Sequence, residues 1–205
     1  MNLNQFKDNI VTLKYIDPKI IDEQTFDIDE KHLSKVSKIA SDIGTACYFT
    51  NEEITLTKIA ALVHDMHKTK SNKKTHAKDA SDLIDSSNSF QTDLGILFYE
   101  EFNLHFTPRM LTSITCAVRN HQKMDSLKEN EVTGQMYKIA LAVYAADKID
   151  KFRKEEDYSD AEFDDKMKKA YNKISKQYRK IADDMKPTIT HIKDGYKKKY
   201  ANNQC

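Results

Sequence analysis

The chain has 205 residues, 39% of them hydrophobic and 32% charged, which is typical of a folded protein with one full core and excludes disorder throughout. Only four glycines and three prolines occur, so long helices are favoured over a sheet with many tight hairpins. Residues 166–205 hold 12 Lys or Arg and 3 Asp or Glu, a net charge of +9, and the total of +1 leaves −8 on residues 1–165. We therefore expect an all-α body, residues 1–165, and a basic helical extension, residues 166–205.

The cysteines and the hydropathy pattern indicate a cytoplasmic protein. Cys47, Cys116 and Cys205 are far apart and form no CxxC pair, which predicts neither a disulfide framework nor a thiolate zinc site. No apolar stretch approaches the roughly 20 residues of a membrane span, and the first residues are too polar for a signal peptide. We expect no membrane segment.

The first strong helix is predicted over residues 29–43. Its acidic start suits the helix dipole, and its apolar side chains recur on one face together with His32. Gly44 is expected to end this helix. A second helix is predicted to open at Thr50, because Thr-Asn-Glu-Glu has the pattern of a capping box.

Histidines stand in line with the next apolar segments. The second helix runs directly into the doublet His64-Asp65, and a third helix, after a basic loop, begins at His76 with apolar residues on one face. A fourth helix is predicted over about residues 92–102. Each of the first three predicted helices thus carries a histidine on or beside its apolar stripe.

Two further helices bring another histidine and a carboxylate. Thr107-Pro108 combines an N-cap with proline at the first helical position, and it opens a helix that aligns His121 with apolar residues. The sixth helix contains the run Ile139–Ala146, which is apolar nearly all round and predicts a central, buried helix. This apolar run leads into Asp147.

The two aspartates at the ends of apolar runs need a compensating charge. Burial of an ionised carboxylate is costly unless a cation or hydrogen-bond donors compensate, and a metal ion would serve both Asp65 and Asp147. Imidazole and carboxylate ligands suit one or two divalent ions of Mn, Fe, Co, Ni or Zn. A lone histidine on an apolar face is more often a core residue than a ligand, but four such histidines argue against coincidence.

The order of these residues resembles the HD superfamily of metal-dependent phosphohydrolases, which is named after its adjacent His-Asp doublet. The resemblance covers about residues 28–153 and includes the small apolar residues before the doublet and Lys68 after it. It implies a helical bundle in which the ligands of one ion are His32, His64, Asp65 and Asp147. The other two histidines, His76 and His121, would hold a second ion or bind substrate.

Residues 146–153 further resemble the branch that splits diadenosine tetraphosphate symmetrically, because Asp150 and Arg153 follow Asp147 at that branch's spacing. Two features depart from it. The 11 residues from Asp65 to His76 are fewer than expected for that branch, and Met-His replaces the usual Ile-Gly after the doublet. The single histidine at His121 argues against the cyclic-di-GMP phosphodiesterase branch, so the subfamily stays open.

The implied activity is hydrolysis of a phosphoester or phosphoanhydride bond in a nucleotide or another phosphorylated small molecule. A bound ion acidifies water and neutralises phosphate oxygens. Asp65 and Lys68 are predicted to be catalytic, with Lys68 stabilising charge on the phosphoryl oxygens. The predicted substrate contacts are His76, His121 and Arg153.

Two alternatives stay open, as does the oligomeric state. The extension interleaves tyrosines with lysines, a composition that can stack bases and contact phosphates, so it also predicts a nucleic-acid-binding module. A solvated amphipathic helix is favoured, because apolar residues recur at helical spacing and form a stripe that could dock on the body. These residues are Met167, Ala170, Tyr171, Ile174, Tyr178 and Ile181. The other alternative is an HD fold that binds a nucleotide without cleaving it.

Overall fold

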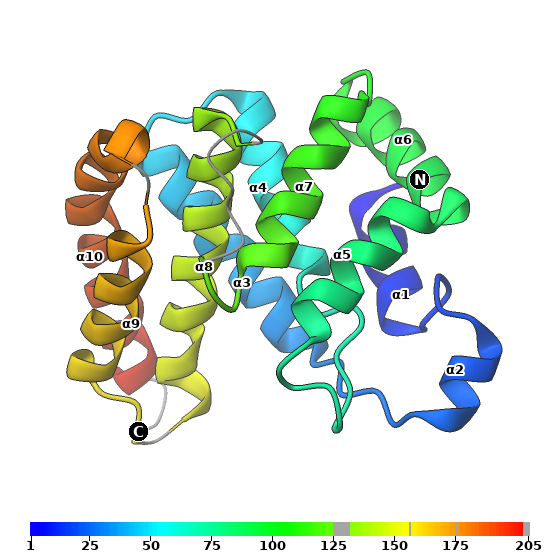
Figure 1. The fold of residues 1–205 in the computed structure, drawn as a ribbon, viewed down its shortest axis with the longest axis horizontal. Coiled ribbons are helices and arrows are strands. Elements are labelled where there is room, and N and C mark those ends of the chain that lie inside the picture. The colour runs from blue at the N-terminus through cyan, green and yellow to red at the C-terminus, as the bar shows by residue number, and fades with distance from the viewer. Residues whose placement is uncertain (125–131, 156, 175, 203–205) are drawn as a thin grey trace.

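The computed structural model describes residues 1–124, 132–155, 157–174 and 176–202, and every regular element in these ranges is a helix (Figure 1). The elements are α1 (Leu3–Val11), α2 (Pro18–Glu23), α3 (Glu30–Ala46), α4 (Asn51–Val63), α5 (His76–Ser86), α6 (Asn88–Phe102), α7 (Pro108–Asn120), α8 (Gly134–Lys154), α9 (Asp160–Asn172), the short 3-10 helix η1 (Lys176–Tyr178) and α10 (Arg179–Asn202). The described part of the chain holds no strand, only an isolated antiparallel bridge between Phe26 and Thr69. The all-α prediction is confirmed.

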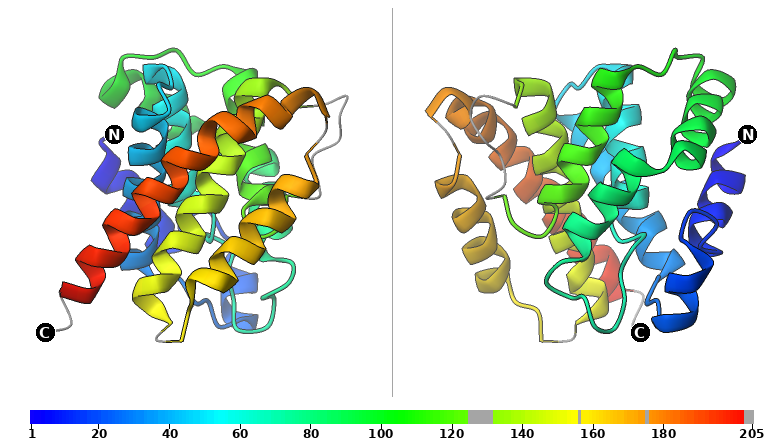
Figure 2. Two further views of the ribbon diagram at one scale, coloured as in Figure 1. Left: turned by 90° about the vertical axis from the view of Figure 1, so that its left-hand side faces the viewer. Right: turned by 45° about the vertical axis from the view of Figure 1, so that its right-hand side comes forward.

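Helix α8 is the centre of the bundle. It packs against α3, α4 and α7, and α4 contacts both α3 and α7 (Figure 1). Every residue of α8 from Ile139 to Asp150 is buried, as the apolar run predicted. Helix α5 packs on α7, while α10 crosses α8 and also contacts α3 (Figure 2).

The predicted helix starts are confirmed where they place ligand residues. The hydroxyl of Thr50 accepts from the Glu53 amide and the Glu53 carboxylate accepts from the Thr50 amide, so a capping box opens α4. Thr107 caps α7 ahead of Pro108, and α5 begins at His76.

Two helix boundaries differ from the predictions. Gly44 does not end α3, which continues to Ala46. A Cβ at Gly44 would lie 3.0 Å from the ring of Phe49, so this glycine permits close packing, and the left-handed residue after the helix is Tyr48. Helix α6 begins earlier than expected because the hydroxyl of Ser87 caps it.

The C-terminal extension docks on the body. Met167 and Ala170 of the predicted apolar stripe are buried, and the ring of Tyr178 stacks on Tyr137 with centroids 5.6 Å apart. The extension thus docks through apolar residues, but the prediction of a single helical stripe is wrong, because α9 ends at Asn172 while Tyr178 lies in η1 and Ile181 in α10. The expected division between residues 165 and 166 falls inside α9, so the two-part organisation stays a prediction.

The structure also bears on the predictions about membrane segments and cysteines. Among the helices described, none combines the length and the apolar character of a membrane span. Cys47 and Cys116 are free thiols, and Cys205 lies outside the described residues.

Candidate metal centre

The six residues predicted as metal ligands lie in one buried cluster. They come from five helices that are far apart in sequence: α3, the end of α4, the start of α5, the end of α7, and α8. None is more than 9% exposed. They are His32, His64, Asp65, His76, His121 and Asp147.

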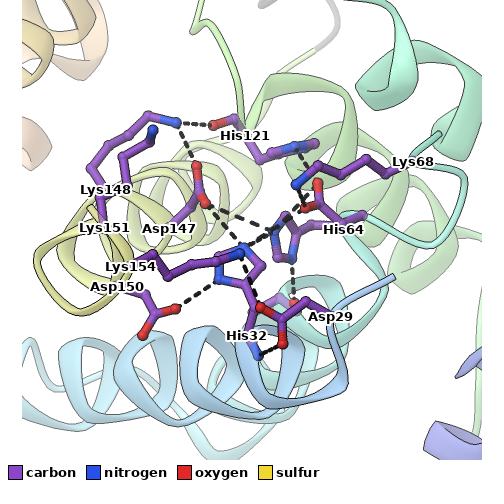
Figure 3. A network of polar contacts seen from close by, with 12 residues as sticks. Asp29, His32, His64, Lys68, His121, Asp147, Lys148, Asp150, Lys151 and Lys154 are labelled. Carbon is purple, nitrogen blue, oxygen red and sulfur yellow. Dashed lines mark hydrogen bonds and ion pairs between the residues drawn. The ribbon is translucent and has the colours of Figure 1, made fainter. Parts of the chain in front are cut away.

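The first set of ligand atoms belongs to His32, His64 and Asp147, and these atoms lie within 4.8 Å of one another. The two Nε2 atoms of His32 and His64 face each other at 3.2 Å, and the Oδ1 atom of Asp147 lies 3.4 Å from His32 Nε2 (Figure 3). One ion placed among these atoms can contact all three side chains.

Asp65 connects this first set to a second one, formed by His64, Asp65 and His121, again within 4.8 Å. The Oδ1 atom of Asp65 lies 3.2 Å from His121 Nε2 and 2.9 Å from His76 Nε2. Its Oδ2 atom lies 3.7 Å from His32 Nε2. The carboxylate thus has one oxygen toward each set, which is the position of a ligand that can bridge two ions.

The hydrogen bonds of the imidazoles fit a cation. His64 Nδ1 donates to the Ala61 carbonyl at 2.7 Å and His32 Nδ1 donates to Asp150 at 2.8 Å, so both Nε2 lone pairs point into one gap. Burial lowers the pKa of His64 to about 3. Burial also acts to lower the pKa of His32, but Asp147 and Asp150 outweigh it and raise that pKa to about 9. A proton on His32 or a divalent ion therefore has to separate the two nitrogens.

The C-terminal ends of two helices also favour a cation at the cluster. His64 directly follows the last residue of α4, and His121 directly follows the last residue of α7. His121 Nδ1 donates at 2.6 Å to the carbonyl of Val118 in the last turn of α7, which also accepts from the backbone amide of His121. The negative ends of both helix dipoles thus point at the cluster and favour a cation there.

Asp147 lies within α8 and not at its end, because the helix continues to Lys154. Lys148 Nζ donates to Asp147 at 2.5 Å and to the carbonyl of His121 at 3.2 Å (Figure 3). Burial acts to raise the pKa of the Asp147 carboxyl, but Lys148 and His32 outweigh it and hold that pKa well below its usual value. The pKa of Asp65 is also well below its usual value, since His64 and His121 outweigh burial. Both carboxylates are ionised, as metal ligands must be.

Asp150, which the sequence singled out only by its spacing from Asp147, lies directly behind His32. Its fully buried carboxylate accepts from His32 Nδ1, from the Arg153 guanidinium at 2.7 Å and from the Tyr200 hydroxyl at 3.2 Å. A carboxylate behind a ligand histidine fixes the ring and makes it a stronger ligand. The signal in the sequence was the spacing of Asp147 and Asp150, which puts two carboxylates on one face of a buried helix.

We expect Asp150→Ala to weaken metal binding and turnover about 10–100-fold, as for other residues that support a ligand histidine. Titration of metal-free protein with Mn or Co measures the affinity. Asp164→Ala, at an exposed position of α9, is the matched control. An affinity within twofold of wild type in the Asp150 variant would contradict the positioning role.

Lys68, predicted to be catalytic, and Arg153, predicted to contact the substrate, lie in different places. Lys68 Nζ lies 2.8 Å from Asp65 Oδ2, and although burial acts to lower the pKa of Lys68, Asp65 outweighs burial and raises it. Arg153 does not line the cavity beside the cluster, and its guanidinium is engaged with Asp150. A direct contact between Arg153 and substrate therefore stays a prediction.

A cavity of about 480 Å³ opens beside the cluster and includes Asp65, His76, His121 and Asp147 in its lining. This volume is in the range of small-molecule sites. Nine lysines of the described chain also line it, and three of them, at positions 166, 169 and 173, belong to α9. The cavity therefore includes residues of the extension.

The fold and the site define a helical protein with a buried histidine–aspartate centre suited to a divalent metal. Residues 30–151 match the model of the family described as the HD domain. The match covers more than half of the chain, so the chain belongs to the HD domain family, whose members are in general metal-dependent phosphohydrolases. The match to the family model does not support assignment to the diadenosine-tetraphosphatase branch. No curated protein and no solved structure matches significantly.

Proposed function

We propose that this protein is a metal-dependent phosphohydrolase that cleaves a phosphoester or phosphoanhydride bond of a nucleotide or another phosphorylated small molecule. The observation that carries the proposal is the position of Asp65, which belongs to the second set of ligand atoms, lies 3.7 Å from His32 of the first set and lines the lysine-rich cavity. The free thiols of Cys47 and Cys116 are in keeping with activity in the cytoplasm.

Different residues of the cluster have different roles in the proposed reaction. Divalent ions supply an acidified water and positive charge for the phosphoryl oxygens. His32, His64, Asp65 and Asp147 would hold one ion, and Asp65 also belongs to the second set of ligand atoms. His76 and His121 would hold a second ion or donate to the substrate phosphate.

The test is phosphate release by purified protein loaded separately with Mn, Fe, Co, Ni or Zn. The substrates are nucleoside mono-, di- and triphosphates and dinucleoside polyphosphates. We expect release with at least one metal and none after chelation. A metal-loaded protein that binds nucleotides and releases no phosphate from any of them would instead support the non-catalytic HD fold.

Lys68→Ala is expected to retain metal and lose about 10²-fold in turnover, the effect of removing one donor that stabilises transition-state charge. Lys68 lines the cavity, whereas the exposed Lys70 does not, so Lys70→Ala is the matched control. Metal content by elemental analysis and kcat are measured for both variants. Loss of metal in Lys68→Ala would assign this lysine to the stability of the centre and not to the chemistry.

Two other hypotheses, nucleic-acid binding by the extension and cleavage of diadenosine tetraphosphate, receive less support from the contacts. In the extension, Tyr196 donates to Asp42 and Tyr200 to Asp150, so these rings are held by the fold, which disfavours base stacking. Cleavage of diadenosine tetraphosphate rests on the resemblance of residues 146–153 alone, and there the Arg153 guanidinium supports a ligand histidine through Asp150. The substrate panel tests that branch directly.

A further inference from the structure

Three lysines converge beside the metal centre where α9 faces α8. Lys148 and Lys151 stand three residues apart on α8, and Figure 3 shows both side chains near Asp147. Lys166 approaches them from α9 and lines the same cavity. Burial lowers the pKa of Lys166, and repulsion by the ammonium groups of Lys151 and Lys148 lowers it further.

Tyrosine rings hold these lysines in place. Lys166 Nζ lies 4.7 Å from the ring centroid of Tyr158, and Lys151 Nζ lies 5.7 Å from the same centroid. Lys148 Nζ lies 4.8 Å from the ring centroid of Tyr144, whose hydroxyl donates to the backbone carbonyl of Lys166 at 3.1 Å. The aromatic faces stabilise the ammonium groups without neutralising them.

The lining of the cavity is strongly positive, because its described residues include nine lysines and only two carboxylates, those of Asp65 and Asp147. Lys148 pairs with Asp147, which would itself be a metal ligand, and Lys151 pairs with Glu155, whose side chain is 48% exposed. Glu155 and Glu162 attract the ammonium group of Lys166, but neither glutamate lines the cavity. Metal binding would add positive charge at Asp147. The cavity would then favour an anion that carries several negative charges.

We propose that Lys148, Lys151 and Lys166 form a second phosphate subsite, which selects substrates that carry a further phosphate beyond the one at the metal centre. This inference rests on the proposed phosphohydrolase function and narrows its substrates to polyphosphorylated compounds. Lys166 lies outside residues 30–151, so the extension supplies part of the substrate specificity.

Binding is tested first, in metal-free full-length protein, by calorimetric titration with inorganic tripolyphosphate and with orthophosphate. We expect tripolyphosphate to bind at least tenfold more tightly, and Lys166→Gln to weaken it about tenfold, because each bond between an ammonium group and a phosphate is charge-assisted. Lys168→Gln is the matched control, since Lys168 is on α9 but does not line this cavity. Circular dichroism checks that both variants are folded.

Three outcomes would overturn the subsite: equal binding of the two anions, equal weakening by the two variants, or Lys166-dependent binding of an RNA oligonucleotide but not of tripolyphosphate. Turnover is the second readout. We expect Lys166→Gln to lower kcat/KM for ATP about tenfold more than for p-nitrophenyl phosphate, and an equal loss on both would also contradict the proposal. Tripolyphosphate binding through Lys166 without phosphate release from any metal-loaded sample would leave the subsite standing and remove the hydrolase function.

Discussion

Asp65→Asn is expected to abolish phosphate release, with a loss of about 10³-fold or more in kcat/KM. The substitution keeps the size of the side chain and one oxygen, but it removes the negative charge of the carboxylate that belongs to the second set of ligand atoms and lies 3.7 Å from His32 of the first. Metal ions contribute several kcal/mol to the stabilisation of transition-state charge, and each ~1.4 kcal/mol is a factor of ten. Metal content should fall together with activity, because the remaining ligands include only one carboxylate.

The measurements for this variant are elemental analysis and phosphate release on the substrate panel, with circular dichroism to check folding. Asp164→Asn, at an exposed position of α9, removes the same charge away from the site and should match wild type. If Asp65→Asn hydrolyses the substrates as fast as wild type, the activity belongs to another site or to a contaminant. The non-catalytic binding function then becomes the better explanation.

The parts of the site that the sequence predicted are those that local signals determine. Caps at Thr50 and Thr107 set the helix starts, and the helical period then places each histidine relative to an apolar face. Because the apolar faces must meet in one core, the ligand residues in line with them meet as well. The family resemblance added the pairing of His64 and Asp65 with the distant Asp147.

The parts that the sequence missed depend on contacts between distant segments. Asp150 is a ligand support only because α3 brings His32 against α8, and Tyr200 from α10 reaches the same carboxylate. Gly44 was expected to end α3, but its role is decided by the ring of Phe49. The lysines of α9 were interpreted as a solvated or nucleic-acid-binding face, and their position in the cavity follows from how the extension docks.

Removal of the metal is expected to lower the melting temperature by about 10 °C. The ligands come from five helices, so an ion that binds only the folded state stabilises the packing of all of them. An ion present at about 1,000 times its Kd adds ~4 kcal/mol, and a protein of this size shifts by about 2–4 °C for each kcal/mol. Thermal unfolding followed by circular dichroism, before and after dialysis against a chelator, measures the shift.

The variant Asp65→Asn supplies the control for this experiment, because a protein without bound metal should melt at the same temperature with and without chelator. Adding Mn, Fe or Co back to the dialysed wild type should restore its melting temperature, since the ligand cluster is formed by the fold and not by the ion alone. If protein prepared in metal-supplemented medium contains no transition metal, and added metals leave its melting unchanged, the assignment of His32, His64, Asp65 and Asp147 as ligands is wrong. The buried proton on His32 would then be the group that separates the two imidazole nitrogens.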